Sequence, residues 1–111
     1  MDRLLKATKY SLMGLKAAWE TEAAFRQEVF LFIILAPLGM WLGESGLERA
    51  ALVGALFIVL IAELLNSGLE AAIDRIGEDI HPLSKKAKDV GSAAVFIALV
   101  NVVVTWGLIL V

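Results

Sequence analysis

The chain has 111 residues, of which 59% are hydrophobic, with a formal net charge of −2 at pH 7 and a mean hydropathy of +0.80. A soluble domain of this length is far less apolar, so the composition excludes an ordinary soluble enzyme and indicates an integral membrane protein. The chain has no cysteine, which excludes disulfides, thiol catalysis and thiolate metal sites.

Residues 2–20 are predicted to form an amphipathic helix. Leu5, Leu12 and Trp19 recur at helical spacing, whereas Arg3 and Lys6 lie on another face. Such a helix is expected on the cytoplasmic surface of a membrane. Because no cleavable secretory leader is visible, we expect the first membrane span to direct insertion.

Three apolar segments follow and are predicted to span the membrane, at residues 26–43, 50–73 and 90–111. The last two are long enough for a hydrocarbon core of ~30 Å at a rise of ~1.5 Å per residue. Lys and Arg gather before the first span and between the second and third, whereas the loop after the first span carries only Arg49. The predicted fold class is therefore an all-α membrane protein with three transmembrane helices and a cytoplasmic N-terminus, forming a single domain over residues 1–111.

Polar side chains interrupt the second predicted span. Glu63, Asn66, Glu70 and Asp74 are spaced so that they share one face of a helix. Glu63 is expected roughly 10 Å inside the inner boundary of the hydrocarbon, where an ionised residue costs ~2.5–3.5 kcal/mol, so a functional role is favoured. The alternatives are a polar clamp between helices for Glu63 and Asn66, and a solvated helix end where Asp74 pairs a loop cation.

A second polar cluster precedes the first span and lies at the same predicted depth as Glu70. It contains Glu22, Arg26 and Glu28. Carboxylates from two helices are what Mg²⁺ binds when substrate phosphates complete its coordination. The simpler interpretation of Glu22 and Arg26 is an ion pair between residues four apart on a helix.

Residues 77–89 are predicted to form a cytoplasmic loop, because Gly77 and Pro82 break the helical pattern on either side of His81. The end of this loop, where the third span begins, adds Lys88 and Asp89 at the same level. Lys88 is placed to reach a phosphate, and Asp89 is placed to cap the helix. The layout favours phosphoryl transfer to a lipid, with a nucleotide in water and Glu63 at the hydroxyl of an embedded acceptor. No glycine-rich phosphate loop is present, which argues against a soluble kinase fold.

Three segments carry a resemblance to a known family: EAAFRQE (22–28), AELLNSGLEAAIDRIG (62–77) and HPLSKKAKDVGSAAV (81–95). They resemble the small integral-membrane diacylglycerol kinases of bacteria, and the resemblance covers nearly the whole chain. It implies a homotrimer of three-span subunits in the inner membrane that uses MgATP to phosphorylate diacylglycerol to phosphatidic acid. No nucleic-acid partner is expected.

The resemblance also implies roles for individual residues. Glu63 matches the family's general base, and Glu22 and Glu70 match its metal carboxylates. Positions that match its nucleotide and phosphate contacts are Arg3, Tyr10, Glu22, Glu70, Asp79, His81, Lys88 and Asp89. Positions that match residues around the acceptor and the catalytic centre are Arg26, Gln27, Glu28, Glu63, Asn66 and Ser92.

Other functions fit parts of the same pattern. An undecaprenol kinase would use the same chemistry on a polyprenol, and the catalytic residues do not separate it from a diacylglycerol kinase. A small proton-coupled transporter would also bury a Glu, but it usually needs a fourth span and gains nothing from interfacial Glu22 and Lys88. An assembly or regulatory membrane peptide is a third alternative.

Overall fold

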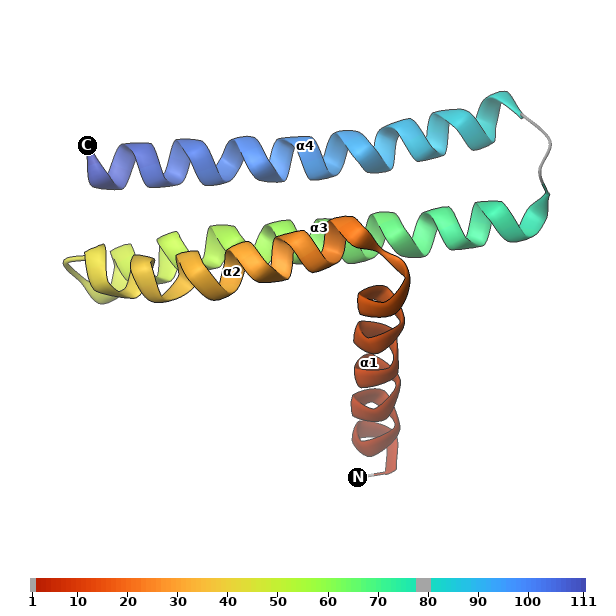
Figure 1. The fold of residues 1–111 in the computed structure, drawn as a ribbon, viewed down its shortest axis with the longest axis horizontal. Helices are drawn as coiled ribbons and strands as arrows, with labels where there is room; N and C mark the ends of the chain where they lie inside the picture. The colour runs from red at the N-terminus through yellow and green to blue at the C-terminus, as the bar shows by residue number, and fades with distance from the viewer. Residues whose placement is uncertain (1, 78–80) are drawn as a thin grey trace.

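The computed structural model describes residues 2–77 and 81–111, and these residues form four α-helices. They are α1 (Asp2–Thr21), α2 (Ala23–Leu42), α3 (Gly46–Ile76) and α4 (Pro82–Leu110). α3 packs against both α2 and α4, and these three helices run side by side, while α1 projects to one side of them (Figure 1). The prediction for Asp79 lies outside the described residues.

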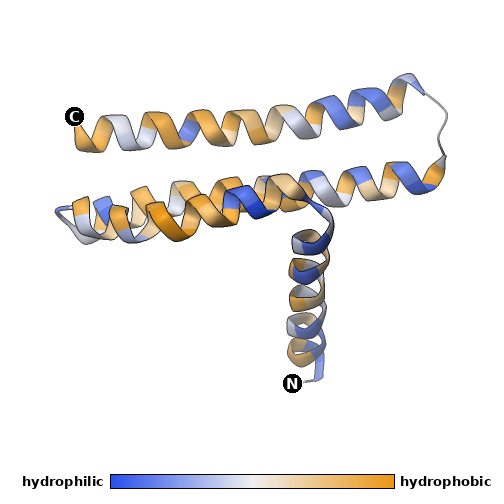
Figure 2. Cartoon of the chain, in the orientation of Figure 1, coloured by the Kyte–Doolittle hydropathy of each residue, from blue (hydrophilic) through white to orange (hydrophobic). Residues whose placement is uncertain are grey.

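The three bundled helices are the ones that carry the hydrophobic residues. α2, α3 and α4 are each long and apolar enough to cross a membrane, with mean hydropathies of 1.5, 2.1 and 2.5 over their most apolar windows. Figure 2 shows hydrophobic residues along most of these helices, with polar residues at the ends of α3 and α4 that are joined by residues 77–81. The all-helical fold with three candidate spans and an additional helix is thereby confirmed.

α4 begins earlier than the sequence predicted. It starts at Pro82, directly after His81, whose Nδ1 accepts a hydrogen bond of 3.0 Å from the Leu83 N–H. Proline suits the first helical turn because its missing N–H would have no partner there. The prediction that Pro82 breaks the helical pattern and that a loop extends to residue 89 was therefore wrong.

The early start also changes the role of Asp89. It lies inside α4, where its Oδ2 is 2.6 Å from Nζ of Lys85, one turn earlier. His81 provides the helix cap instead. The prediction that Asp89 caps the third span was wrong, because the helix it was to cap begins a full two turns before it.

The helices are held together far from the 77–81 connection by a contact that we call the Trp106 layer, formed by Gly39, Leu52 and Trp106. Trp106 Nε1 donates a hydrogen bond of 3.0 Å to the carbonyl of Leu52, which is fully buried. A Cβ on Gly39 would lie 3.2 Å from Leu52 Cβ and 3.3 Å from Trp106 Cζ2, so glycine is what lets α2 approach the other two helices. Nearer the middle, the rings of Phe32 and Phe57 meet edge to face with centroids 4.7 Å apart.

Candidate functional site

Glu63 continues the buried face of α3. This face carries Leu52, Leu56 and Val59 at helical spacing, and Glu63 follows them with only 6% of its surface exposed. It is the one buried charged residue in the part of the chain that the structure describes. A carboxylate in such a position is expensive to keep, so it calls for a functional explanation.

Three further carboxylates interact with Glu63 electrostatically: Glu28, Glu22 and Glu70. We call these four residues the carboxylate cluster. α2 contributes Glu28, the break between α1 and α2 contributes Glu22, and α3 contributes Glu63 and Glu70. The structure therefore gathers the predicted base, both predicted metal carboxylates and one residue predicted near the acceptor.

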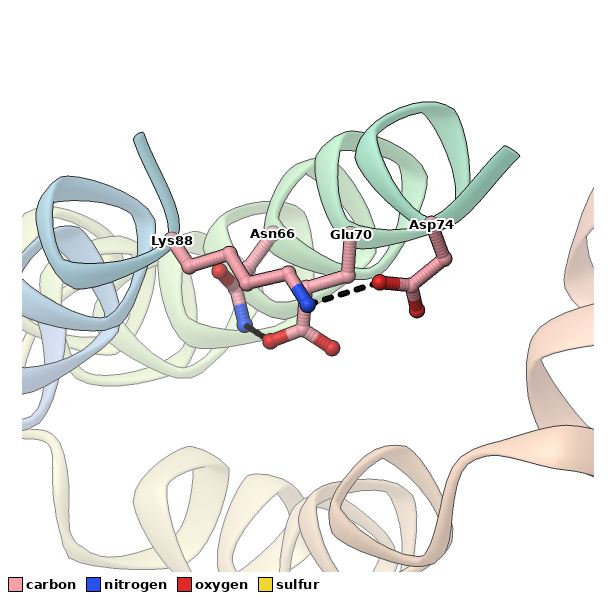
Figure 3. A network of polar contacts seen from close by, with 4 residues as sticks. All are labelled: Asn66, Glu70, Asp74 and Lys88. Carbon is pink, nitrogen blue, oxygen red and sulfur yellow. Dashed lines mark hydrogen bonds and ion pairs between the residues drawn. The ribbon is translucent and has the colours of Figure 1, made fainter. Parts of the chain in front are cut away.

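Asn66 supports this cluster through Glu70. Its Nδ2 donates a hydrogen bond of 3.2 Å to Glu70 Oε1, one turn further along α3 (Figure 3). This bond leaves Glu70 Oε2 without a bond to Asn66. Asn66 Oδ1 is buried and has no hydrogen-bond partner among the described residues.

Lys88 reaches from α4 to the same face of α3. Its Nζ lies 2.6 Å from Asp74 Oδ1, and Figure 3 shows Asn66, Glu70, Asp74 and Lys88 together on one side of α3. The alternative interpretation, in which Asp74 pairs a loop cation, is met by Lys88, which lies in the predicted loop 77–89 but belongs to α4 in the structure. Glu70 lies near enough to Lys88 to interact with it as well, so an ammonium group stands beside the carboxylate cluster.

Glu22 and Arg26 do not form the predicted ion pair. Arg26 Nη1 instead donates a hydrogen bond of 2.6 Å to the carbonyl of Trp19. The reason is that Glu22 has an extended backbone between α1 and α2, with φ −114° and ψ 106°, so the chain does not hold the two side chains as neighbours on one helix. The Glu22 carboxylate makes no capping bond to α2 either, which leaves it available to a ligand.

Glu22 also borders a cleft of about 560 Å³ between α1 and α3. Small and apolar residues form most of its walls, including Gly14, Ala18, Leu64 and Gly68. A cleft of this size and polarity suits part of an apolar ligand. Its position brings such a ligand next to the carboxylate cluster.

Other predicted site residues lie away from the cluster or on the surface. Arg3 and Tyr10 belong to α1, which points away from the bundle, and the Tyr10 side chain is 64% exposed (Figure 1). Gln27 and Ser92 are exposed. His81 and Asp89 have the local contacts of α4 described above.

One residue of the site was missed from the sequence. Gly91 of α4 lies against Asn66, because a Cβ at this position would overlap Asn66 Oδ1. Its place one turn after Lys88, in a run of small residues at the start of a predicted span, was the available signal. The partner helix and the facing residue could be known only from the packing.

The donor set fits a magnesium ion that is shared with phosphates. Among residues 2–77 and 81–111, no group of three His, Cys, Asp or Glu side chains is placed to hold a cation alone. Mg²⁺ is usually bound by one or two carboxylates together with substrate phosphates and water. Three carboxylates interact with Glu63, and two of them, Glu22 and Glu70, have oxygens not used in capping or in the Asn66 bond, so they offer such ligands.

The fold and the site together define a multi-span helical membrane protein with an acidic, lysine-flanked centre at one end of its bundle. Residues 9–110 match the prokaryotic diacylglycerol kinase family, and the chain belongs to this family. It is 50% identical over 110 residues to a diacylglycerol kinase of Haemophilus influenzae, which covers 99% of this chain and 93% of the relative.

Two further relatives are similar over almost the same length. A diacylglycerol kinase of Pseudomonas aeruginosa is 51% identical over 110 residues, covering 99% of this chain and 89% of the relative. One from Escherichia coli is 46% identical over 108 residues, covering 97% and 88%. These similarities favour a lipid kinase over the transporter and the assembly peptide that the sequence pattern left open.

Proposed function

We propose that this chain transfers the γ-phosphoryl group of MgATP to diacylglycerol, which yields phosphatidic acid at the cytoplasmic face of the bacterial inner membrane. The observation that carries the proposal is the burial of Glu63 among Glu22, Glu28 and Glu70, in a chain of this family. Lys and Arg gather before α2 and at the ends of α3 and α4 that face residues 77–81, namely Arg75, Lys85, Lys86 and Lys88, and this supports a cytoplasmic N-terminus.

Glu63 acts as the general base. Its buried carboxylate is the deepest member of the cluster along α3, so it meets the hydroxyl of an acceptor whose tails remain in the leaflet. It accepts the hydroxyl proton as the acceptor oxygen attacks the γ-phosphorus in line with the leaving β,γ-bridging oxygen. Five further residues are assigned to the surroundings of the acceptor, with Gln27 and Ser92 reaching it from the exposed surface of the subunit: Arg26, Gln27, Glu28, Asn66 and Ser92.

Glu22 and Glu70 hold the magnesium ion together with the ATP phosphates. Glu22 stands at the break between two helices, and Glu70 is steadied by Asn66, so both present carboxylate oxygens from defined positions. When bound there, the ion offsets repulsion within the carboxylate cluster and charge on the phosphates.

Lys88 contacts the nucleotide phosphates. Its present partner Asp74 holds the ammonium group on the cluster side of α3. A triphosphate carries more negative charge than one carboxylate, so Lys88 exchanges its bond to Asp74 for a phosphate oxygen when ATP binds. His81 and Asp89 complete the nucleotide site at this end of the bundle, and Asp79, outside the described residues, is assigned to the nucleotide by the resemblance alone.

The active protein is a homotrimer whose sites are shared between neighbouring subunits. Arg3 and Tyr10 serve the nucleotide, yet the helix that carries them points away from its own bundle (Figure 1). A neighbouring bundle is the natural place for them to act. α4 has few buried residues in a single subunit, and its exposed apolar face supports packing against another copy.

The acyl chains of the acceptor occupy the cleft between α1 and α3. Its small and apolar walls accept hydrocarbon, and Glu22 at its border connects the cleft with the metal site. α1 lies on the membrane surface, so the cleft opens toward the headgroup region.

The test is phosphate transfer from labelled ATP to lipid by the purified protein in mixed micelles. Diacylglycerol should be phosphorylated, and its kcat/KM should exceed that of undecaprenol measured in the same micelles. A higher kcat/KM for undecaprenol would make the chain a polyprenol kinase. Failure to phosphorylate either lipid would overturn the proposal.

A further inference from the structure

The Asn66 amide has one group that forms a hydrogen bond and one buried group that has no hydrogen-bond partner among the described residues. Nδ2 donates to Glu70 at 3.2 Å, whereas Oδ1 is buried and accepts no hydrogen bond from the described residues. An unpaired buried acceptor is unfavourable, so this orientation needs a cause outside the amide itself. The atoms that surround Oδ1 supply the cause.

Gly91 of α4 faces Oδ1 directly. A Cβ at this position would overlap Oδ1 and would come within 3.1 Å of Leu69 Cδ2. The glycine hydrogen that replaces the Cβ therefore points toward Oδ1, which is a contact that recurs where helices approach closely. A larger residue at position 91 would take this space, so the Asn66 amide would have to move from its present place for α4 to pack as it does.

The amide cannot turn over in this setting. A flipped amide would direct its oxygen at the Glu70 carboxylate, where two acceptors repel, and its NH₂ at the hydrogens of Gly91. Lys88, one turn before Gly91, is bonded to Asp74, one turn after Glu70. Two successive turns of α4 thus contact α3: Lys88 is paired with Asp74, and Gly91 packs against Asn66.

We infer that Gly91 is a positioning residue, which holds the Asn66 amide so that it fixes one oxygen of Glu70 and leaves the other directed at the metal site. The inference rests on the proposed kinase function and assigns Asn66 an orienting role toward Glu70. Hydrogen-bond partners of metal ligands commonly change metal affinity by ~10–100-fold when they are removed.

The decisive comparison is Gly91→Ala against Gly107→Ala. Both change a glycine of α4 to alanine, but nothing lies within 4 Å of a Cβ at Gly107. Gly91→Ala should raise the Mg²⁺ concentration for half-maximal activity by about tenfold or more, with a smaller change in kcat at saturating Mg²⁺. Mn²⁺ binding in the presence of a non-hydrolysable ATP analogue, followed by electron paramagnetic resonance, should weaken by a similar factor. Gly107→Ala should leave both measurements unchanged.

A double-variant cycle separates positioning from general packing. Asn66→Ala alone should weaken Mn²⁺ binding as Gly91→Ala does. Adding Gly91→Ala to it should cause no further loss, because Asn66 Oδ1 is gone and the remaining contact, 3.1 Å to Leu69 Cδ2, is with the end of a flexible side chain. If Gly91→Ala does not fold, the comparison of Asn66→Ala with the double variant decides the question in the same way.

Two results would overturn the inference. The first is unchanged Mn²⁺ binding in Gly91→Ala or in Asn66→Ala, and the second is a further loss on adding Gly91→Ala to Asn66→Ala. Either result would overturn the positioning role while wild-type lipid phosphorylation continued to support the proposed function. A wild-type protein that phosphorylates no lipid would instead remove the proposed function.

Discussion

The Trp106 layer and the carboxylate cluster each depend on a glycine where two helices meet. At the Trp106 layer, Gly39 admits apolar neighbours and the indole N–H finds the Leu52 carbonyl. At the cluster, Gly91 makes room for the Asn66 amide oxygen, which has no donor among the described residues, close to the acids that interact with Glu63. A glycine thus allows close helix packing in both places, but the polar group beside it is hydrogen-bonded at the Trp106 layer and unpaired among the described residues at the cluster.

The difference indicates which region contributes stability and which contributes chemistry. Satisfied hydrogen bonds and close apolar contacts stabilise a helix bundle in a membrane. Clustered carboxylates and an unpaired acceptor do not, and such features persist mainly where a function requires them. Substitutions in the Trp106 layer should therefore lower stability, whereas substitutions in the cluster should lower activity.

The largest expected effect is that of Glu63→Gln, which keeps the shape of the side chain and removes the base. Phosphoryl transfer should fall by ~10² or more in kcat, within the range of general-base effects. Binding of MgATP and assembly should be retained, since the proposal assigns the metal to Glu22 and Glu70 and the Gln side chain keeps the size of Glu63. Turnover, nucleotide binding and oligomeric state should be measured on the same preparation. Near-normal turnover would remove Glu63 from its role.

The second prediction concerns the sharing of sites between subunits. Arg3→Ala and Glu63→Gln should each be poorly active at low ATP concentration, the first through nucleotide binding and the second through loss of the base. Unfolded, mixed in equal amounts and refolded, they should regain activity in about a quarter of the sites of a cyclic trimer, where an intact Glu63 meets an intact Arg3 of its neighbour.

Tagged subunits show whether mixed trimers have formed. Refolding each variant alone is the matched control. Mixed trimers as inactive as both parents would place every site within a single subunit. Arg3 of α1 would then not act at the carboxylate cluster of a neighbour.

The third prediction concerns the metal ligands. Glu22→Ala and Glu70→Ala should each raise the half-saturating Mg²⁺ concentration by about tenfold or more, because one of two carboxylate ligands is lost. Glu20→Ala, which removes an acid from exposed α1 near the same break, is the control and should behave as wild type. An unchanged half-saturation point in both cluster variants would exclude them as ligands.

The sequence predicted the features that depend on local pattern. Hydropathy marked the three spans, helical spacing placed Asn66, Glu70 and Asp74 on one face, and one alternative interpretation had Asp74 pair a loop cation. These predictions hold because they depend on one helix and its solvent. The identity of the cation, Lys88, was not predicted because it depends on how α4 packs on α3.

The errors have the same physical origin. The ion pair between Glu22 and Arg26 assumed a continuous helix, but the backbone at Glu22 is extended. Asp89 was assigned as a cap because Pro82 was taken as an interruption rather than a first-turn residue. Gly91 was passed over because its role exists only through the opposing Asn66. Backbone breaks and contacts between helices were therefore what spacing along a single helix did not reveal.

The smallest expected effect tests the Trp106 layer. Trp106→Phe keeps an aromatic ring beside Gly39 but removes the donor to the Leu52 carbonyl. The free energy of unfolding in mixed micelles should fall by about 1 kcal/mol, the usual contribution of one hydrogen bond, while kcat and the Mg²⁺ requirement of the folded protein stay at wild-type values. Val104→Ala, on an exposed face of the same helix, is a control for loss of side-chain volume and should have a smaller effect. If Trp106→Phe altered the Mg²⁺ requirement, the two regions would be coupled along α4, and the separation of stability from chemistry would be wrong.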